Sequence, residues 1–353
     1  MLSSPATTTA DRIVSVGVPV PGLGLLSYRV PDGMPLPPKG ARVLVPIGAR
    51  SVLGCVVDPH APAPVDAVLR DIARVLDAEP FLPPMVVDLA LWVAEYYAAG
   101  PGDALAVAMP PASRRGESTA FRTVQVATMS VLAAESPTLK GAKQRVLLEQ
   151  LRDRPAGLTL PELGGLGISA ATVRSLAKLG ALTISDRVVE RDPFAEMPGG
   201  AALWTLHALP AEQRSLTTEQ TEALRTLEDA AARQSFATVL LQGVTGSGKT
   251  ELYLRLASAV LQTGRRVLVL VPEIGLTPAV AGLFRASFGS RVAIQHSGLS
   301  SGERHDQWHR IRRGEIDIVV GTRSAVFAPL ERIGLVVVDE EHDSAYKQEE
   351  TPR

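Results

Sequence analysis

From residue 239 to the C-terminus, short apolar runs alternate with stretches whose apolar residues recur every three or four positions. Short apolar runs predict buried strands, and the longer spacing predicts amphipathic helices. The predicted strands are 239–241, 267–271, 292–294, 316–320 and 335–338, and the first predicted helix carries Leu252, Leu256 and Val260. Strands that alternate with helices in this way indicate a doubly wound parallel sheet of the α/β class.

The front of the chain has a different pattern, in which β-like runs are broken by Pro and Gly. The runs 13–16, 25–30, 42–45 and 52–57 predict a compact small sheet or barrel. A helix is then predicted from Pro83-Pro84 to Gly100, with an apolar face that carries Val86, Leu89, Trp92, Val93 and Tyr96. Aromatic residues at helical spacing are more often core than base-stacking groups, so we expect Trp92, Tyr96 and Tyr97 to be buried.

The middle of the chain begins at the boundary Met109-Pro110-Pro111 and predicts three helices, 141–151, 159–163 and 169–179. Ser169 is placed to cap the third helix and Gly180 to end it. The runs 182–184 and 188–189 predict a small hairpin, and three helices plus a hairpin are typical of a winged helix. Arg174 and Lys178 on the third helix would face a phosphate backbone. Winged helices also bind proteins, so DNA binding and protein binding both remain open.

The polar stretch 192–200 is interpreted as a linker, which completes a multidomain plan. We expect a β-rich N-terminal domain over residues 11–110, a winged-helix domain over 111–198 and an α/β P-loop domain over 205–353.

Composition limits the kinds of site that the chain can hold. Its 353 residues suit two or three domains, and its one cysteine excludes an internal disulfide and a cysteine-cluster zinc site within this sequence. We expect a reducing, cytoplasmic setting. No apolar run approaches the roughly 20 residues needed to span a bilayer, so no membrane partner is expected. The formal net charge is −1, so any DNA site must come from local patches.

The strongest candidate site is the glycine-rich segment between the first predicted strand and its helix. It reads Gly243-x-x-x-x-Gly248-Lys249-Thr250, the spacing of a P-loop. Its backbone N–H groups and the helix N-terminus suit a phosphate, with Lys249 on the β- and γ-phosphates of ATP and the Thr250 hydroxyl on Mg²⁺. The alternative is a glycine-rich turn without a ligand. The expected nucleotide-binding residues are Gly243, Val244, Thr245, Gly246, Ser247, Gly248, Lys249, Thr250 and Glu251.

A second motif, Asp339-Glu340-Glu341-His342, follows the run 335–338. That unbroken run is typical of a strand buried on both faces of a parallel sheet, whose carboxyl end is where ligands bind. We expect Asp339 to hold Mg²⁺ together with Thr250, and Glu340 to orient or deprotonate the attacking water. The catalytic set is thus Lys249, Asp339 and Glu340. A purely solvated acidic loop is the alternative, and His342 can be read as a surface residue.

Gln220 is a further candidate because its carboxamide can pair with the donor and acceptor edge of adenine. Thr217-x-x-Gln220 is also a capping box, and the two roles need not exclude each other.

Together these motifs resemble the PriA family of replication restart DNA helicases. The resemblance rests on the two motifs above and on Val271-Pro-Glu-Ile-Gly-Leu-Thr-Pro278, His296-Ser-Gly-Leu299, Gly321-Thr-Arg-Ser-Ala325 and Tyr346-Lys-Gln348. It implies an ATP-driven 3′→5′ helicase that binds stalled or D-loop forks and single strands. It also implies DNA contacts by Thr277, Thr322 and Arg323, and partnership with primosome proteins and single-stranded DNA-binding protein.

The front of the chain is similar to the family's N-terminal domain, which captures the 3′ end of a nascent strand. Val18-Pro-Val-Pro21 and Arg42-Val-x-Val-Pro-x-Gly48 carry this likeness. The stretch Leu26-Ser27-Tyr28 stands where some members have Phe-Asp-Tyr, so Tyr28 is retained without the acidic residue. Arg70 stands where a basic residue is expected.

The resemblance covers only the front half of such a protein. The chain stops at Arg353, whereas PriA proteins continue with a zinc domain and a second helicase lobe, so we expect a truncated form whose zinc ligands are absent. The competing hypothesis is a fork-binding module that holds nucleotide without turning it over appreciably. An ATPase directed at a protein or a small molecule is disfavoured by the particular motifs.

Overall fold

A computed structural model describes residues 12–65, 68–115, 121–130, 142–194, 215–244, 246–272 and 277–347. The chain divides into two compact units, one formed by residues 119–191 and the other by the remainder. Across the described ranges, no helix is both long and apolar enough to cross a membrane.

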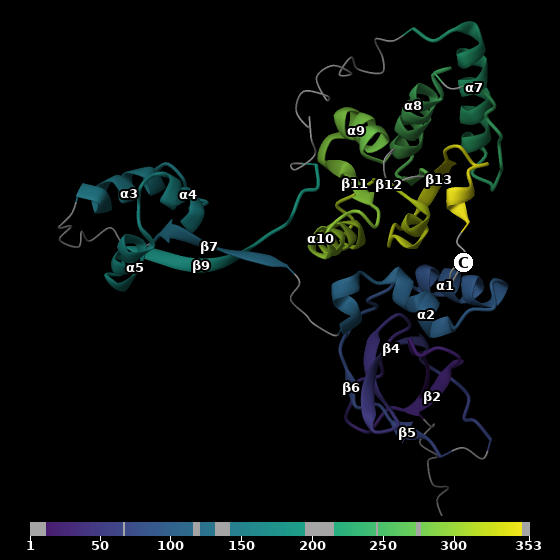
Figure 1. Cartoon of the computed structure of the whole chain (residues 1–353), viewed down its shortest axis with the longest axis horizontal. Helices are drawn as coiled ribbons and strands as arrows, with labels where there is room; N and C mark the ends of the chain where they lie inside the picture. The colour runs from purple at the N-terminus through teal and green to yellow at the C-terminus, as the bar shows by residue number, and fades with distance from the viewer. Residues whose placement is uncertain are drawn as a thin grey trace, which may run out of the picture. The chain divides into compact units, whose positions relative to one another are not determined.

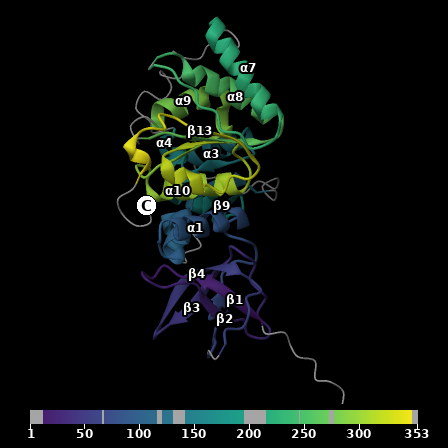
Figure 2. The same cartoon turned by 90° about the vertical axis from the view of Figure 1, so that its right-hand side faces the viewer.

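The N-terminal sheet forms where the β-like runs predict it. Strands β1 (Ile13–Gly17), β2 (Leu26–Arg29), β3 (Arg42–Ile47) and β4 (Arg50–Asp58) pair antiparallel, and two short strands, β5 (Arg70–Asp71) and β6 (Arg74–Val75), close the edges in the order β5-β2-β1-β4-β3-β6. Figure 2 shows this sheet with helix α1 (Pro84–Tyr96) beside it. Valines from alternate positions fill its core. The two-residue strands are too short to leave a pattern in the sequence.

The prediction that the α1 aromatics are buried was wrong. Trp92 and Tyr96 are 56% and 68% exposed, and Tyr97 is exposed as well. The buried face of α1 is made instead by small and β-branched residues that pack near α2 (Pro101–Ala108): Val86, Val87, Ala90 and Ala94. Trp92 therefore points away from the core and stacks on Tyr96 with ring centroids 5.1 Å apart.

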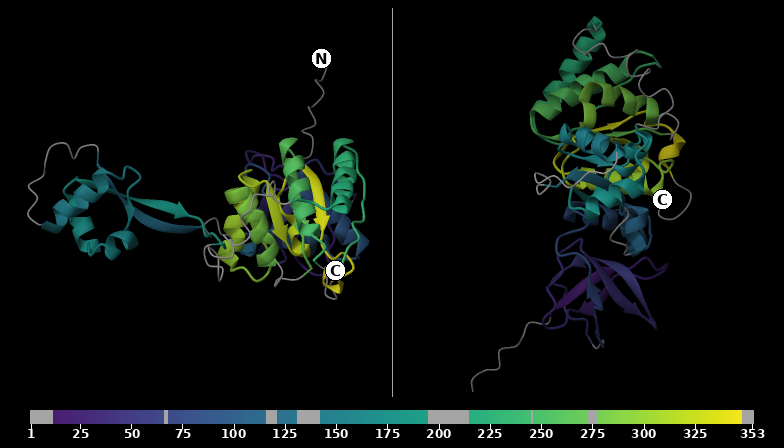
Figure 3. Two further views of the ribbon diagram at one scale, coloured as in Figure 1. Left: turned by 90° about the horizontal axis from the view of Figure 1, so that it is seen from above. Right: turned by 90° about the vertical axis from the view of Figure 1, so that its left-hand side faces the viewer.

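The C-terminal part is the predicted α/β layer structure. Strands β10 (Arg266–Leu270), β11 (Val292–Gln295), β12 (Ile318–Gly321) and β13 (Ile333–Val338) form a parallel sheet in the order β11-β12-β10-β13. Helices α8 (Lys249–Gln262) and α9 (Thr277–Phe288) cover one face, while α10 (Ser301–Arg312) and the 3₁₀ turn η5 (Arg323–Phe327) cover the other (Figures 1 and 3). Helix α7 (Thr218–Ala232) packs on α8.

Two predictions about this sheet were wrong. Residues 239–241 are not a strand, and Val239 and Leu240 are exposed. The run 335–338 is not buried on both faces, since Val336 and Val338 are also exposed. β13 is an edge strand of the described sheet and 239–241 is not paired with it, so side chains of both runs remain exposed.

The start of the predicted linker is anchored rather than free. Phe194 is buried in the core of the α/β part, and the Arg285 guanidinium lies over its ring while pairing with Asp192 at 2.9 Å. Residues 195–200 lie outside the described ranges.

The unit of residues 119–191 contains the three predicted helices, α3 (Ala142–Arg152), α4 (Leu160–Gly165) and α5 (Ala170–Lys178). The predicted cap is present, because the Ser169 side chain accepts a hydrogen bond from the Thr172 N–H. The predicted hairpin is wrong: 182–189 is one strand, β9 (Leu182–Val189), paired along its length with β7 (Arg122–Met129), which pairs on its other side with β8 (Leu158–Thr159). The sequence pattern did not reveal the antiparallel partner β7, which pairs with the backbone of Asp186 and Arg187 and so keeps the strand continuous there.

Candidate nucleotide-binding site

The glycine loop ends at the N-terminus of α8 in the conformation that a phosphate site requires. Gly246 and Gly248 have φ values of +80° and +86°, a region that favours glycine. Gly248 is the N-cap residue and has no side chain to occupy the first-turn N–H groups. These donors therefore remain directed at the space beyond the helix, where the helix dipole favours an anion. Thr245 lies outside the described residues.

Lys249 joins the two nucleotide motifs. Its Nζ donates to the Gly243 carbonyl at 2.9 Å and lies 3.2 Å from Oε1 of Glu340. Glu340 has a φ of +47°, an uncommon conformation for a residue other than glycine, and it turns back from the end of β13 toward the lysine. The predicted P-loop lysine and the predicted water-orienting carboxylate are thus neighbours.

Two tyrosines hold Asp339 in place: sequence reasoning missed Tyr253, and it noted Tyr346 only as part of a family motif. Tyr253, one turn after Lys249 on α8, donates its hydroxyl to Oδ1 of Asp339 at 3.1 Å. The Tyr346 hydroxyl donates to the backbone carbonyls of Asp339 and Leu270, at 2.7 and 3.0 Å. Burial, followed by the charge of Asp339, raises the pKa of both hydroxyls above its ordinary value, so both remain donors. The i+4 spacing of Tyr253 from Lys249 was the available signal.

Gln220 fixes the loop from the side. Its Oε1 accepts from the Thr217 N–H at 2.9 Å and Thr217 Oγ1 accepts from the Gln220 N–H, so the predicted capping box is present. The Gln220 amide also donates to the Ser247 carbonyl at 2.8 Å. Because that amide already contacts the loop, Gln220 lies where it can serve the base of a nucleotide only by sharing or exchanging these hydrogen bonds.

The small space around two of its glycines is a second observation that suits the loop to a nucleotide phosphate. A Cβ added at Gly243 would lie 2.7 Å from Oγ of Ser247, and one at Gly248 would lie 2.5 Å from Nε2 of Gln220. The atoms met are the ends of side chains, so Ser247 and Gln220 lie directly against these two glycines and a larger residue would displace them. Residues 243–249 would hold the phosphates of ATP, and Thr250 and Asp339 would hold Mg²⁺. A magnesium ion supplies positive charge at the phosphate oxygens.

The two candidate DNA residues of the N-terminal sheet, Tyr28 and Arg70, lie beside each other, but only Arg70 is exposed. Tyr28 and Arg70 are register partners of the parallel pair β2 and β5. Tyr28 is only 4% exposed, and its hydroxyl donates to the Pro46 carbonyl at 3.2 Å. Its ring is therefore part of the core and does not present a stacking face, whereas Arg70 is exposed and donates to the Gly48 carbonyl at 3.1 Å.

The candidate DNA residues of the α/β part lie at the carboxyl ends of its strands. Thr322 follows β12, and its N–H donates to the Gln295 carbonyl at the end of β11. The Arg323 guanidinium donates to the carbonyls of Ala345 and Lys347, at 2.8 and 2.6 Å. Arg323 thereby ties the segment after β12 to the loop that follows the acidic motif. The side chain of Thr277 is outside the described residues, as is Gln348.

Two family models and several known proteins match this chain. Residues 15–110 match the model of the 3′ DNA-binding domain, and residues 217–351 match that of the DEAD/DEAH box helicase. The replication restart protein PriA of Haemophilus influenzae is 36% identical over an alignment of 350 positions, which covers 97% of this chain and 46% of that protein. The PriA of Synechocystis is 32% identical over an alignment of 401 positions, gaps included, which covers 92% of this chain and 47% of that protein.

The chain is a relative of PriA. The PriA of Bacillus subtilis is 42% identical over 223 residues, 62% of this chain and 27% of that protein. The chain spans about half the length, or less, of these PriA proteins, and it carries the family's 3′ DNA-binding and helicase domains.

Tyr253→Phe should destabilise the α/β part by about 1–2 kcal/mol at pH 8, because it deletes a hydrogen bond to a charged group. The raised pKa means that the folded chain keeps a proton that the unfolded tyrosine releases above pH 10.0. The stability that this tyrosine contributes is therefore present below pH 10 and falls as the pH rises further. Urea unfolding at pH 8 and pH 10.5 checks this: the free energy of unfolding of the parent should exceed that of the variant by less at pH 10.5 than at pH 8.

Tyr96→Phe, at an exposed tyrosine, is the matched control and should change stability by less than about 0.5 kcal/mol. A Tyr253→Phe variant as stable as the parent at pH 8 would contradict the assigned hydrogen bond.

Proposed function

We propose that this chain is the nucleotide- and DNA-binding front part of a PriA-type helicase that acts in replication restart. In this proposal ATP drives 3′→5′ movement on DNA, and stalled or D-loop forks are the substrate. The observation that carries the proposal is the pairing of Lys249 with Glu340, which joins a P-loop to an acidic helicase motif. The family matches at residues 15–110 and 217–351 supply the DNA context.

The proposed domains are a 3′-end DNA-binding domain at 11–110, a winged helix at 111–198 and helicase lobe 1 at 205–353. Three helices on a small antiparallel sheet support the winged helix, whose wing would be built from β7 and β9. Primosome proteins and single-stranded DNA-binding protein are proposed as partners, and the cytoplasm as the location, on the family relationship alone.

Each site residue has a proposed role. The Lys249 ammonium binds the β- and γ-phosphates, which displace Glu340 from it. Glu340, released from that pair, orients the attacking water. Asp339, with Oδ1 held by Tyr253, and the Thr250 hydroxyl would be the ligands of Mg²⁺. The Gln220 amide, adjacent to the loop, would contact adenine.

Lys249→Ala should abolish the binding of ATP, because it removes the only P-loop side chain that pairs with phosphate charge. Calorimetry with ATP and Mg²⁺ on the parent and the variant tests this directly. Lys178→Ala, at an exposed lysine of α5 in the other compact unit, removes the same charge and should leave ATP binding unchanged. Equal affinity of the Lys249→Ala variant and the parent would refute the assignment of the P-loop.

Fork DNA should bind with an affinity that falls steeply as salt rises, since each neutralised phosphate releases counterions. If two or more phosphates are neutralised, we expect at least about a tenfold loss of affinity between 50 and 200 mM salt, measured with a fluorescent fork. Arg174→Ala on α5 should weaken binding, whereas Arg225→Ala on the exposed side of α7 should not. Affinity that does not depend on salt, or no binding at 50 mM, would argue against a DNA role.

A second candidate function, a fork-binding module that holds nucleotide without appreciable turnover, is favoured by the engagement of Arg323. An arginine that stabilises the transferring phosphoryl group is worth about 10³ to 10⁵ in rate. Arg323, a candidate for that task within this lobe, donates to two backbone carbonyls instead. We therefore expect residues 1–353 alone to show negligible DNA-stimulated ATP hydrolysis.

A phosphate-release assay with and without fork DNA decides between the two functions. Robust hydrolysis by residues 1–353 that disappears on Glu340→Gln would favour the helicase function for this chain itself. Nucleotide binding without hydrolysis would favour the binding module.

A further inference from the structure

A polar pocket lies away from the nucleotide site, where the end of α2 and the 3₁₀ turn η1 (Pro111–Arg115) meet the α/β sheet. These elements belong to one compact unit. The pocket encloses about 680 Å³ of empty space, with the open solvent at its mouth included. Its polar lining includes Arg114 of η1, Gln295 and His296 at the end of β11, and Arg304 and Trp308 of α10, together with Ser297 and Ser324.

Four of these side chains have buried polar atoms that find no hydrogen-bond partner in the described part of the protein. The atoms are Nε2 of Gln295, both ring nitrogens of His296, Nε of Arg304 and Nε1 of Trp308. His296 is 6% exposed and Trp308 is 4% exposed. Leaving a buried donor unsatisfied costs about 1–3 kcal/mol, so four such side chains around one pocket indicate a site built for a polar ligand.

The lining is rich in donors and positive charge. Arginine and the tryptophan N–H can only donate, and Arg304 lies one turn before Trp308 on α10. Burial, and next the charge of Arg304, lower the pKa of Arg114, which places the two guanidinium groups within electrostatic reach of each other. The neighbouring carboxylate, Glu303, is engaged with the Ser300 N–H at 2.8 Å in the cap of α10.

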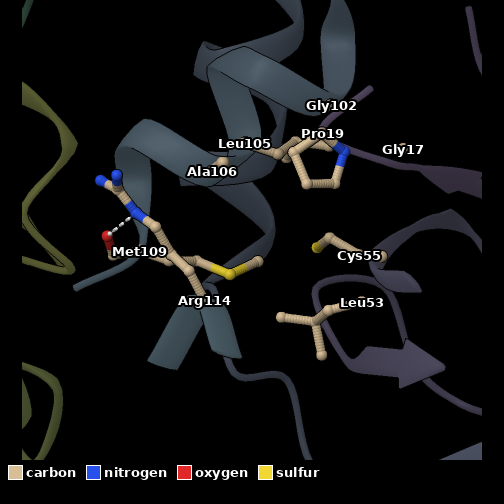
Figure 4. Close-up of a pocket in the computed structure, with 10 residues that line it drawn as sticks. Gly17, Pro19, Leu53, Cys55, Gly102, Leu105, Ala106, Met109 and Arg114 are labelled. Atoms are coloured by element: carbon tan, nitrogen blue, oxygen red, sulfur yellow. Dashed lines mark hydrogen bonds between the residues drawn. The ribbon is translucent and has the colours of Figure 1, made fainter. Parts of the chain in front are cut away.

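The Arg114 side chain is held in position by backbone carbonyls at the end of α2 and just after it. Its Nε donates to the Met109 carbonyl at 3.1 Å, and Figure 4 shows the guanidinium turned away from Cys55 and Pro19. Those residues line a second, mostly apolar pocket in which Cys55 is buried and burial raises the pKa of its thiol to about 12. Apart from Arg114, which borders both pockets, the residues that line this second pocket are uncharged, so the polar chemistry of this region is concentrated on the other side of Arg114.

We propose that the pocket lined by Arg114, Gln295, His296, Arg304 and Trp308 binds a phosphate group. A phosphate offers several acceptor oxygens and a negative charge, which two guanidiniums, an indole N–H and an amide N–H can satisfy together. The imidazole of His296, whose pKa is lowered by its burial, adds one donor in its neutral form. If the function proposed above holds, the group is a phosphodiester of the bound DNA strand.

The test compares charge removal at the pocket with charge removal elsewhere near the same helix. Single-stranded DNA is titrated against the full chain over a series of salt concentrations. Arg304→Gln should lower the magnitude of the slope of log affinity against log salt by about 0.7 for each phosphate that the protein no longer neutralises. Arg313→Gln, which removes an exposed charge paired with Glu315 beyond the end of α10, should leave the slope unchanged.

Trp308→Phe is a second variant that keeps an aromatic ring to stack on Phe81 and removes the N–H donor together with the five-membered ring. It should weaken DNA binding severalfold while leaving the salt slope close to that of the parent, and the smaller buried side chain should lower the thermal midpoint. An unchanged affinity in both Arg304→Gln and Trp308→Phe would rule out a phosphodiester of the bound DNA strand as the group in the pocket.

A parallel titration with inorganic phosphate separates the two sources of the group. Thermal stabilisation of the parent, but not of Arg304→Gln, with unaltered DNA slopes would assign the pocket to free phosphate. If the parent binds DNA, yet Arg304→Gln alters neither the slope nor phosphate stabilisation, the pocket assignment fails and the proposed function stands. If the parent binds no DNA, the proposed function fails, and the phosphate titration alone decides on the pocket.

Discussion

The parallel pairing of β10 with β12 and β13, and of β12 with β11, is the constraint on which both candidate sites depend. Its register aligns Leu270 with Gly321 and Val338, and Gln295 with Gly321, so four strands end at one edge. The residues that follow these strands, among them His296, Thr322 and Asp339, are thereby gathered along that edge without any sequence proximity. The N–H of Asp339 donates to the Leu270 carbonyl at 2.9 Å, which extends the ladder into the acidic motif.

The sequence allowed the nucleotide loop to be predicted because its determinants are local. Glycine at 246 and 248 is required by the backbone of those residues themselves, and the capping box at Thr217 and Gln220 spans only four positions. The tyrosines that hold Asp339 could not be found in this way. Tyr253 is 86 residues from its acceptor, so its role depends on the packing of α8 against β13.

The wrong predictions share a physical reason, which is that a partner distant in sequence decided the outcome. Apolar composition made 239–241 a predicted strand, but a strand forms only beside a neighbour that takes its backbone hydrogen bonds. The predicted hairpin at 182–189 became one strand because β7 lies along its entire length. On α1, alanine and valine fill the available space, so the larger Trp92 and Tyr96 are left on the exposed face.

The pairing of Lys249 with Glu340 links structure to the proposed chemistry. The same carboxylate pairs with the lysine before a nucleotide binds and would orient the attacking water afterwards. With its φ of +47°, Glu340 is held in a costly conformation that directs it to the lysine ammonium. A phosphate group carries more charge than this carboxylate and would replace it at Lys249. Glu340 would then be a carboxylate without the lysine beside the phosphates, with His342 Nε2 3.8 Å from Oε2, and its Oε1 could accept a hydrogen bond from a water molecule. Binding of the nucleotide would thus itself produce the group that orients the water.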